Sequence, residues 1–198
     1  MGSTSTLAPM PPDASATKKR LLDAAFAEFA EYGLAGARVD RISEEASANK
    51  RLIYVYFTNK ETLFETVIAH SIALLAEAVP FTPDDLPKYA GALFDHLIDH
   101  PEHLRLSIWA GLERPVAVPS EKQSYRAKVA ALAANRPQSE AMEPADVLAL
   151  VIGLATAWLS ASPALRELAD EAPFSPERLD KHRGALVAAV EAIVAGSR

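Results

Sequence analysis

The sequence predicts an all-α protein with an N-terminal three-helix domain followed by a larger C-terminal helical domain. Apolar residues recur every three or four positions in several segments, which is the period of one face of an α-helix. Proline, glycine and asparagine separate these segments at positions where helices begin or end. No segment shows the sustained alternation of apolar and polar residues that indicates a β-strand.

The first expected helix follows a small, polar, proline-containing stretch. Residues 1–16 lack the apolar centre of a signal peptide, so we expect a disordered arm. Thr17 is placed to cap the helix, and Gly33 fits its C-terminal stop. The apolar stripe of this helix consists of Leu22, Ala25, Phe26 and Phe29.

Two short helical segments then flank a polar joint. In the first segment, Val39, Ile42 and Ala46 lie at helical spacing, and Asn49 is a good N-cap for the second. The second segment is crowded with cations and phenols on one side and apolar on the other. A helix-turn-helix whose second helix carries such side chains is typical of DNA major-groove recognition. The inward residues are Leu52, Ile53 and Phe57.

Residues 17–64 resemble the N-terminal DNA-binding domain of TetR-family transcriptional regulators. Tyr32-Gly33 matches the end of the family's first helix, and Val39-Asp40-Arg41-Ile42 with Ala46 matches its second. The string from Ile53 to Leu63, Ile-Tyr-Val-Tyr-Phe-Thr-Asn-Lys-Glu-Thr-Leu, matches the recognition-helix signature throughout. Arg38 and Leu52 depart from the family, which usually has Thr or Ser at both positions.

The resemblance implies roles for the side chains of this domain. Tyr54, Tyr56 and Lys60 would bind phosphates and fix the register on DNA. Lys50 and Arg51 would reach guanine edges, and Val55 a thymine methyl group. Arg38 and the Lys18-Lys19-Arg20 cluster are candidates for phosphate contact, although solvation explains the cluster equally well. The predicted DNA-binding residues are Lys18, Arg38, Lys50, Arg51, Tyr54, Val55, Tyr56 and Lys60.

Charge is distributed unevenly along the chain. Between Asp13 and Thr62, eight Lys or Arg residues balance eight Asp or Glu residues, so the whole net charge of −6 lies in residues 63–198. A neutral module can still bind phosphate if its cations gather on one face, while the acidic remainder stays away from DNA. We therefore expect a DNA-binding domain over residues 17–62 and an effector-binding and dimerisation domain over residues 63–198.

Prolines divide the second domain into helices. A capping box at Thr58-Asn59-Lys60-Glu61 predicts a fourth helix running to about Val79, and the prolines from Pro80 to Pro87 form a linker after it. Further helices are expected at 86–99, 102–112, 121–134, 144–163 and 176–196.

Large apolar side chains in this domain have two interpretations. Core packing is the default for each of them. The family resemblance implies instead a central cavity that accepts a small, largely apolar effector and is lined by aromatic residues. The candidate ligand-binding residues are Phe94, Leu97, Trp109, Leu112, Tyr125, Met142 and Trp158.

Two helices are apolar on nearly all faces and must be covered on all of them. Between Ala185 and Ala195 only Glu191 is charged, and Val147–Leu159 carries no charge. Both helices are either central in a monomer or pack against a second subunit; in the family, the equivalent pair builds a four-helix dimer interface. The predicted interface residues are Leu150, Leu154, Leu186, Val190 and Ile193.

Several other classes of function find no support. The chain has no cysteine, which suits a reducing cytoplasm, and His96, His100 and His103 lack the further ligands of a convincing metal set. No catalytic pattern or cofactor motif is present, and Val147–Leu159 is shorter than the roughly 20 residues of a membrane span.

We therefore expect a homodimeric DNA-binding regulator, a repressor released from its operator by a small molecule. The alternatives are a DNA-binding scaffold whose second domain binds a protein partner, and an all-α enzyme carrying a helix-turn-helix.

Overall fold

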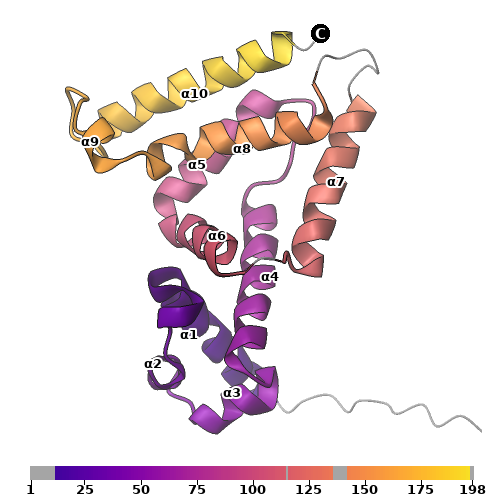
Figure 1. Ribbon diagram of the computed structural model, residues 1–198, viewed down its shortest axis with the longest axis vertical. Coiled ribbons are helices and arrows are strands. Elements are labelled where there is room, and N and C mark those ends of the chain that lie inside the picture. Colours follow the sequence, from indigo (N-terminus) through magenta and orange to yellow (C-terminus); the bar gives the residue numbers. More distant parts are fainter. Residues whose placement is uncertain (1–11, 115, 136–141, 197–198) are drawn as a thin grey trace, which may run out of the picture. The chain divides into compact units, whose positions relative to one another are not determined.

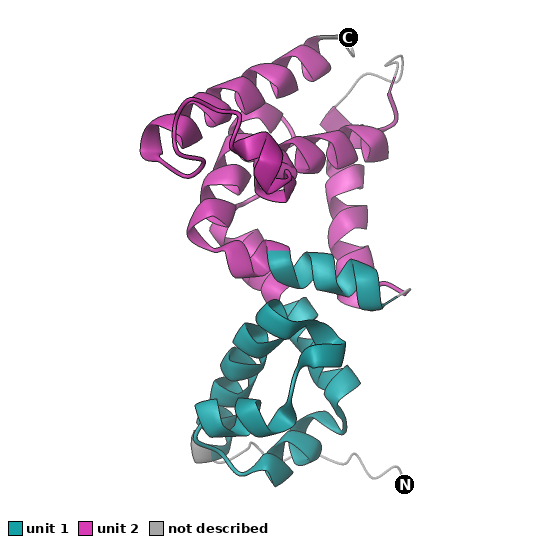
Figure 2. Cartoon of the chain, turned by 60° about the vertical axis from the view of Figure 1, so that its left-hand side comes forward, with its two compact units in different colours: residues 1–70, 105–115 teal, residues 71–104, 116–198 magenta. Residues whose placement is uncertain are grey.

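The computed structural model describes residues 12–114, 116–135 and 142–196, and all regular structure in these ranges is helical (Figure 1). The all-α prediction is therefore confirmed. The described chain divides into two compact units, residues 1–70 with 105–115 and residues 71–104 with 116–198 (Figure 2). The helices are α1 Pro12–Gly36, α2 Val39–Glu45, α3 Lys50–Phe57, α4 Lys60–Ala78, α5 Leu86–Asp99, α6 Pro101–Glu113, α7 Pro119–Asn135, α8 Pro144–Ser160, α9 Pro163–Arg166 and α10 Pro176–Gly196.

The first unit is a small helical domain around an aromatic core. Helix α2 packs on α1 and on α3. The rings of Phe29 in α1 and Phe64 in α4 meet edge to face, with their centroids 4.9 Å apart. Burial of such apolar side chains is the main source of the unit's stability. The fully or almost fully buried residues include Leu21, Ala25, Phe29, Ile42, Ile53, Phe57, Leu63 and Phe64.

Helix α1 begins earlier than the sequence indicated. It starts at Pro12, and Thr17 is buried inside it, where its hydroxyl accepts a hydrogen bond from Arg20 Nη2 at 3.2 Å. The assignment of Thr17 as the N-cap was therefore wrong, as was the disordered arm for residues 12–16; residues 1–11 lie outside the described part. Proline is well suited to the first helical turn, and the alanines that follow favour helix strongly.

Gly33 interrupts α1 where the sequence placed a helix stop. Its φ of 66° and ψ of −175° lie outside the helical region, and glycine adopts a positive φ at little cost. The break turns the backbone N–H groups of Leu34 and Ala35 toward the Glu113 carboxylate of α6, which accepts a hydrogen bond from each. The ring of Trp109 covers Gly33: a Cβ added there would lie 2.7 Å from Trp109 Cε3. Helix α6 is thus fastened to the end of α1.

The second unit is a bundle built on α5, α8 and α10. Helix α5 packs on both α8 and α10, α10 also packs on α8, and α7 packs on α8. Helices α8 and α10 run side by side in Figure 1. Their shared apolar cluster includes Leu93, Phe94, Leu97, Leu132, Val147, Val151, Ala155, Trp158, Leu186 and Val190.

One local expectation in the later helices was wrong. Asn59, and not Thr58, caps α4: its Oδ1 accepts from the Thr62 backbone N–H at 2.7 Å, whereas Thr58 ends α3 with a φ of 68°. Helix α8 stops at Ser160, and a short α9 follows, capped by Ser162. Within the described residues, none of the helices combines the length and apolar character needed to cross a membrane.

Replacing Gly33 by Ala should destabilise the first unit. A non-glycine residue with positive φ costs about 1–2 kcal/mol, and the new methyl group would also collide with Trp109 and Glu113. The matched control is Gly111→Ala in α6, where a Cβ meets no atom within 4 Å; it should raise stability by about 0.5–1 kcal/mol. Chemical unfolding measures both changes, and equal stabilities for the two variants would contradict this account of Gly33.

Candidate nucleic-acid interface

Helix α3 divides its side chains cleanly between core and surface. Asn49 caps the helix, since its Oδ1 accepts from the Arg51 backbone N–H at 2.8 Å, as the sequence predicted. Ile53 and Phe57 are buried and anchor one face. On the opposite face, Tyr54 is 48% and Val55 64% exposed, and Lys50 and Arg51 are exposed beside them. Large aromatic and aliphatic side chains held out in water beside two cations form a surface suited to a groove of DNA.

The joint between α2 and α3 is held to α1 by Arg20. The Arg20 Nε donates to the Ala46 carbonyl oxygen at 3.2 Å, at the C-cap of α2. Ser47 follows with a φ of 48°, a left-handed conformation that reverses the chain direction within a few residues. This contact fixes where α3 begins relative to α1.

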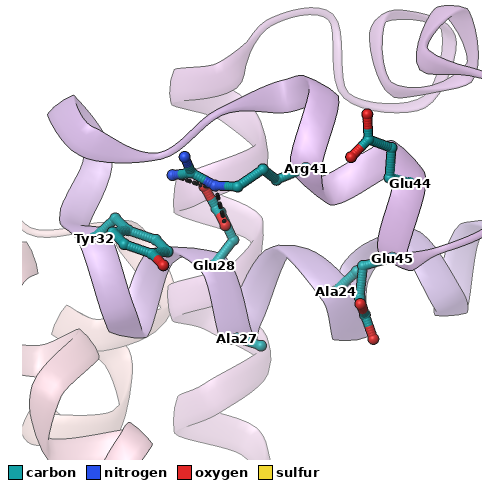
Figure 3. A pocket seen from close by; sticks show the side chains of 7 residues that line it. All are labelled: Ala24, Ala27, Glu28, Tyr32, Arg41, Glu44 and Glu45. Atoms are coloured by element: carbon teal, nitrogen blue, oxygen red, sulfur yellow. Dashed lines mark hydrogen bonds and ion pairs between the residues drawn. The ribbon is translucent and has the colours of Figure 1, made fainter.

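A buried carboxylate fixes the other end of α2. Glu28 of α1 is only 8% exposed. Its Oε1 accepts from Arg41 Nε at 2.8 Å (Figure 3). The same oxygen accepts from the Arg38 backbone N–H at 2.7 Å. The hydrogen bond from Arg41 to Glu28 raises the pKa of the guanidinium above its ordinary value. Arg41 also donates to the Gly36 carbonyl oxygen at 3.1 Å and lies 4.2 Å from the centroid of the Tyr32 ring.

This arrangement replaces the hydroxyl cap that α2 lacks. Arg38 is the N-cap and makes no side-chain capping hydrogen bond. In a capping box, an acidic residue three positions after the cap accepts from the cap's backbone N–H. Here that position holds Arg41, so the carboxylate comes from Glu28, which binds both Arg41 and the Arg38 N–H. The surrounding groove of about 560 Å³ also contains Glu44 and Glu45 (Figure 3).

Two predicted DNA-binding lysines are engaged within the protein. Lys60 is half-buried, and its Nζ donates to the Ala37 carbonyl oxygen at 3.1 Å, so it supports the connection between α1 and α2. Lys50 Nζ lies 2.6 Å from Asp40 Oδ1. This contact raises the pKa of Lys50 and lowers the pKa of Asp40. Because the pair is exposed, water and salt screen it, and DNA phosphates can compete for Lys50.

The other predicted residues lie around α3 to different degrees. Lys18 and Arg38 are exposed, and Lys18 Nζ is 5.6 Å from the Phe57 ring centroid. Tyr56 is half-buried, with its ring 6.2 Å from that of Phe57. Lys19 forms an ion pair with Asp23 at 2.7 Å, and Arg20 donates to the Ala46 carbonyl oxygen, whereas the Lys18 ammonium lies over the Phe57 ring.

The residues expected to bind an effector do not form one group. Phe94, Leu97 and Trp158 are buried in the core of the second unit, and Met142 packs at its edge. Trp109 and Leu112 belong to the first unit, where Trp109 covers Gly33 and Leu112 is 73% exposed. Helical spacing could not reveal this, because α6 contributes to both units. The assignment of Trp109 and Leu112 to an effector cavity stays a prediction.

The three histidines do meet in space, in the second unit. The ring centroid of His96 lies 4.7 Å from that of His100 and 5.2 Å from that of His103. His103 Nδ1 shares a 2.7 Å hydrogen bond with the Ser71 hydroxyl. Burial, followed by the charge of His100, lowers the pKa of His96. Among the described residues, no group of His, Asp or Glu side chains is arranged to hold a metal ion.

Sequence reasoning missed the residues that position the helix-turn-helix. Arg20, Glu28, Arg41 and Glu113 were counted as charges or left aside. A signal for Glu28 was present: it lies four residues after Ala24 and seven after Leu21, both of which are buried, so it shares the inward face of α1. A charged residue on such a face needs a partner.

The geometry therefore defines a helix-turn-helix DNA-binding protein with a second helical unit. The profile for bacterial regulatory proteins of the tetR family matches residues 21–67, and that for the tetracyclin repressor-like C-terminal domain matches residues 85–192. The chain belongs to the TetR family of transcriptional regulators, and like other members it is a DNA-binding regulator and not an enzyme.

Individual relatives support the assignment over most of the chain. The HTH-type transcriptional repressor SCO4008 of Streptomyces coelicolor is 40% identical over 163 residues, which cover 79% of this chain and 84% of the relative. The repressor NicS of Pseudomonas putida is 34% identical over 47% of each chain. The crystal structure of the putative transcriptional regulator SCO4942 from Streptomyces coelicolor has a TM-score of 0.76 at 39% identity and covers 89% of this chain and 97% of its own.

Replacing Glu28 by Gln should loosen α2 and weaken DNA binding. A neutral amide cannot sustain the charge-assisted hydrogen bonds from Arg41 and Arg38, and we expect a loss of about 1–3 kcal/mol in the free energy of unfolding. The control is Glu45→Gln, an exposed carboxylate in the same groove, which should change stability by less than about 0.5 kcal/mol. Urea denaturation of both variants makes the comparison, and indistinguishable midpoints would remove Glu28 from this role.

Substitutions of Arg51 and Lys60 should distinguish a residue that contacts bases from one that also stabilises the fold. Arg51→Ala should lower affinity for a specific site by about 1–3 kcal/mol, leaving non-specific binding and the melting temperature nearly unchanged. Lys60→Ala should weaken both kinds of binding and also lower the melting temperature, since the Ala37 carbonyl loses its donor. Fluorescence anisotropy with specific and scrambled duplexes, beside thermal melts, measures these effects. An unchanged specificity ratio for Arg51→Ala would contradict its assignment to base contact.

Proposed function

We propose that this protein is a homodimeric repressor that leaves its operator when a small molecule binds in the second unit. The observation that carries the proposal is the surface of α3, where Lys50, Arg51, Tyr54 and Val55 are exposed on a helix anchored by Ile53 and Phe57. The SCO4008 relative is named a transcriptional repressor, which supports repression over activation for this protein. An effector acts only through a difference in its affinity for the DNA-binding and the released conformations.

The proposed dimer explains the exposed faces of α8 and α10. Leu186 and Val190 are 3% and 0% exposed and belong to the monomer's own core, so their expected place on the dimer surface was wrong. The chain's own core thus covers one side of these apolar helices. Leu150, at 44% exposed, remains on the surface, and Leu154 and Ile193 are half-buried.

Small residues line the outward faces instead. Gly184, Ala188 and Ala192 recur every four positions on α10 and are exposed, as are Ala149, Gly153 and Ala157 on α8. A Cβ added at Gly153 or Gly184 meets no atom within 4 Å. Small side chains let helices approach closely, and exposed alanine and glycine rows beside Leu150 supply a flat apolar face for the same two helices of a second subunit.

Dimerisation fits the geometry of DNA recognition. One chain supplies one α3, and regulators of this kind bind two half-sites roughly 34–36 Å apart, one helical turn of DNA. A small change in the separation of the two α3 helices prevents simultaneous docking. Binding of an effector to the second unit is proposed to favour that changed separation.

A second candidate function is a DNA-bound scaffold whose second unit binds a protein partner. The burial of Phe94, Leu97 and Trp158 within one apolar cluster of the described chain favours it. Titration with candidate small molecules during operator binding separates the two functions: release by a small molecule supports the repressor, and retention throughout supports the scaffold.

Ala188→Glu should dissociate the dimer without unfolding the chain. The residue is exposed in the single subunit, so a carboxylate there is tolerated in the monomer but costs several kcal/mol if a partner buries it unpaired. The control is Ala130→Glu on the exposed side of α7. Light scattering at micromolar concentration should give a dimer for the wild type and control, and a helical monomer for Ala188→Glu. A monomeric wild type, or a dimer unaffected by the change, would refute this interface.

A further inference from the structure

A lysine in the second unit is surrounded by aromatic rings. Lys128 Nζ lies 5.7 Å from the ring centroid of Tyr89 and 5.9 Å from those of Phe81 and Tyr125. It also donates a hydrogen bond to the Tyr89 hydroxyl at 3.3 Å. Tyr125 and Lys128 are three residues apart on α7, so they share one face of that helix. Tyr89 belongs to α5, and Phe81 to the segment between α4 and α5.

The ammonium group lies among ring faces and not beside a carboxylate of the described chain. Among the described residues, no Asp or Glu forms an ion pair with Lys128, and burial lowers its pKa with no carboxylate to offset the effect. Aromatic faces attract a cation less strongly than a paired carboxylate would in the same surroundings. A half-buried cation in this state is complementary to an anion.

The surrounding phenols are suited to the same ligand. Burial raises the pKa of Tyr89 to about 12, so its hydroxyl keeps its proton at neutral pH. Because that oxygen accepts from Lys128, the phenol proton is free to donate to a second acceptor. Tyr125 is 45% exposed, yet burial, followed by the charge of Glu121, raises its pKa. The Tyr125 ring is therefore partly accessible to a ligand beside the Lys128 ammonium.

We infer that Phe81, Tyr89, Tyr125 and Lys128 form the effector site, and that it takes a planar monoanion, an aromatic carboxylic acid. The carboxylate meets the Lys128 ammonium and the Tyr89 hydroxyl, and the aromatic body lies against the Tyr125 and Phe81 rings. One cation matches one negative charge, which disfavours doubly charged phosphates. The inference rests on the proposed function, because it assigns the chemical class of the effector.

The test compares three probes of similar size on the full chain by isothermal titration calorimetry. Benzoate should bind more tightly than neutral benzamide, and cationic benzyltrimethylammonium should bind least. Lys128→Met should weaken benzoate binding at least about tenfold while leaving benzamide binding unchanged. The control is Lys122→Met, an exposed lysine of the same helix, which should bind all three as the wild type does.

A structural role for Lys128 gives a different pattern. If the lysine only fills space among the rings, Lys128→Met lowers the melting temperature and leaves the preference among the probes unchanged, which overturns the inference. Removal of an uncompensated cation predicts instead an unchanged or higher melting temperature. Absence of benzoate binding to the wild type at millimolar concentration, or a preference for the cationic probe that increases in Lys128→Met, also overturns it.

Operator-binding assays separate this inference from the function on which it rests. If operator DNA binds and benzoate binding ignores Lys128, the assigned site fails while the proposed regulator stands. If benzoate binds through Lys128 but saturating benzoate leaves operator affinity unchanged, the carboxylate site stands and its role as the effector site fails. Failure of every duplex to bind specifically contradicts the proposed function itself.

Discussion

The buried carboxylate of Glu28 is the interaction on which the DNA-binding unit depends. It accepts from the Arg41 guanidinium and from the Arg38 backbone N–H, and so joins α1 to the start of α2. Removing one partner from a buried pair leaves an uncompensated charge, which is why such contacts define position strongly even where their net stabilisation is modest. With α2 fixed at this end by Glu28 and at its other end by Arg20, the start of α3 has little freedom.

Helix type and order were predictable from the sequence because the apolar periodicity and the proline positions agree with each other. The recognition helix was the best case, since Asn49 caps it and Ile53 and Phe57 anchor it as expected. Contacts between distant segments were not predictable in this way. The capping carboxylate for α2 comes from another helix, and Trp109 belongs to the first unit although its helix begins in the second. Apolar periodicity describes one helix at a time, so it predicts neither the capping of α2 by another helix nor the unit to which Trp109 belongs.

The apolar helices α8 and α10 also show that contacts between helices could not be predicted from the sequence. The sequence identified them as covered on every face, but could not say which residues meet the chain's own core. Packing takes the larger side chains Leu186 and Val190 inward and leaves glycine and alanine outside. The outward faces are therefore shaped for close helix approach, whereas a charge at Val190 would disrupt the monomer before it reached any partner. Likewise, the aromatic surroundings of Lys128 combine residues from α5, α7 and the segment before α5, which no spacing rule connects.

The central claim is that two α3 helices, one from each subunit, read DNA together. Selection of bound duplexes from a random-sequence library, followed by sequencing, tests it most directly. The account predicts enrichment of an inverted repeat whose half-sites are separated by about one helical turn, roughly 34–36 Å. Enrichment of a single unrepeated motif, or of no motif at all, would contradict it.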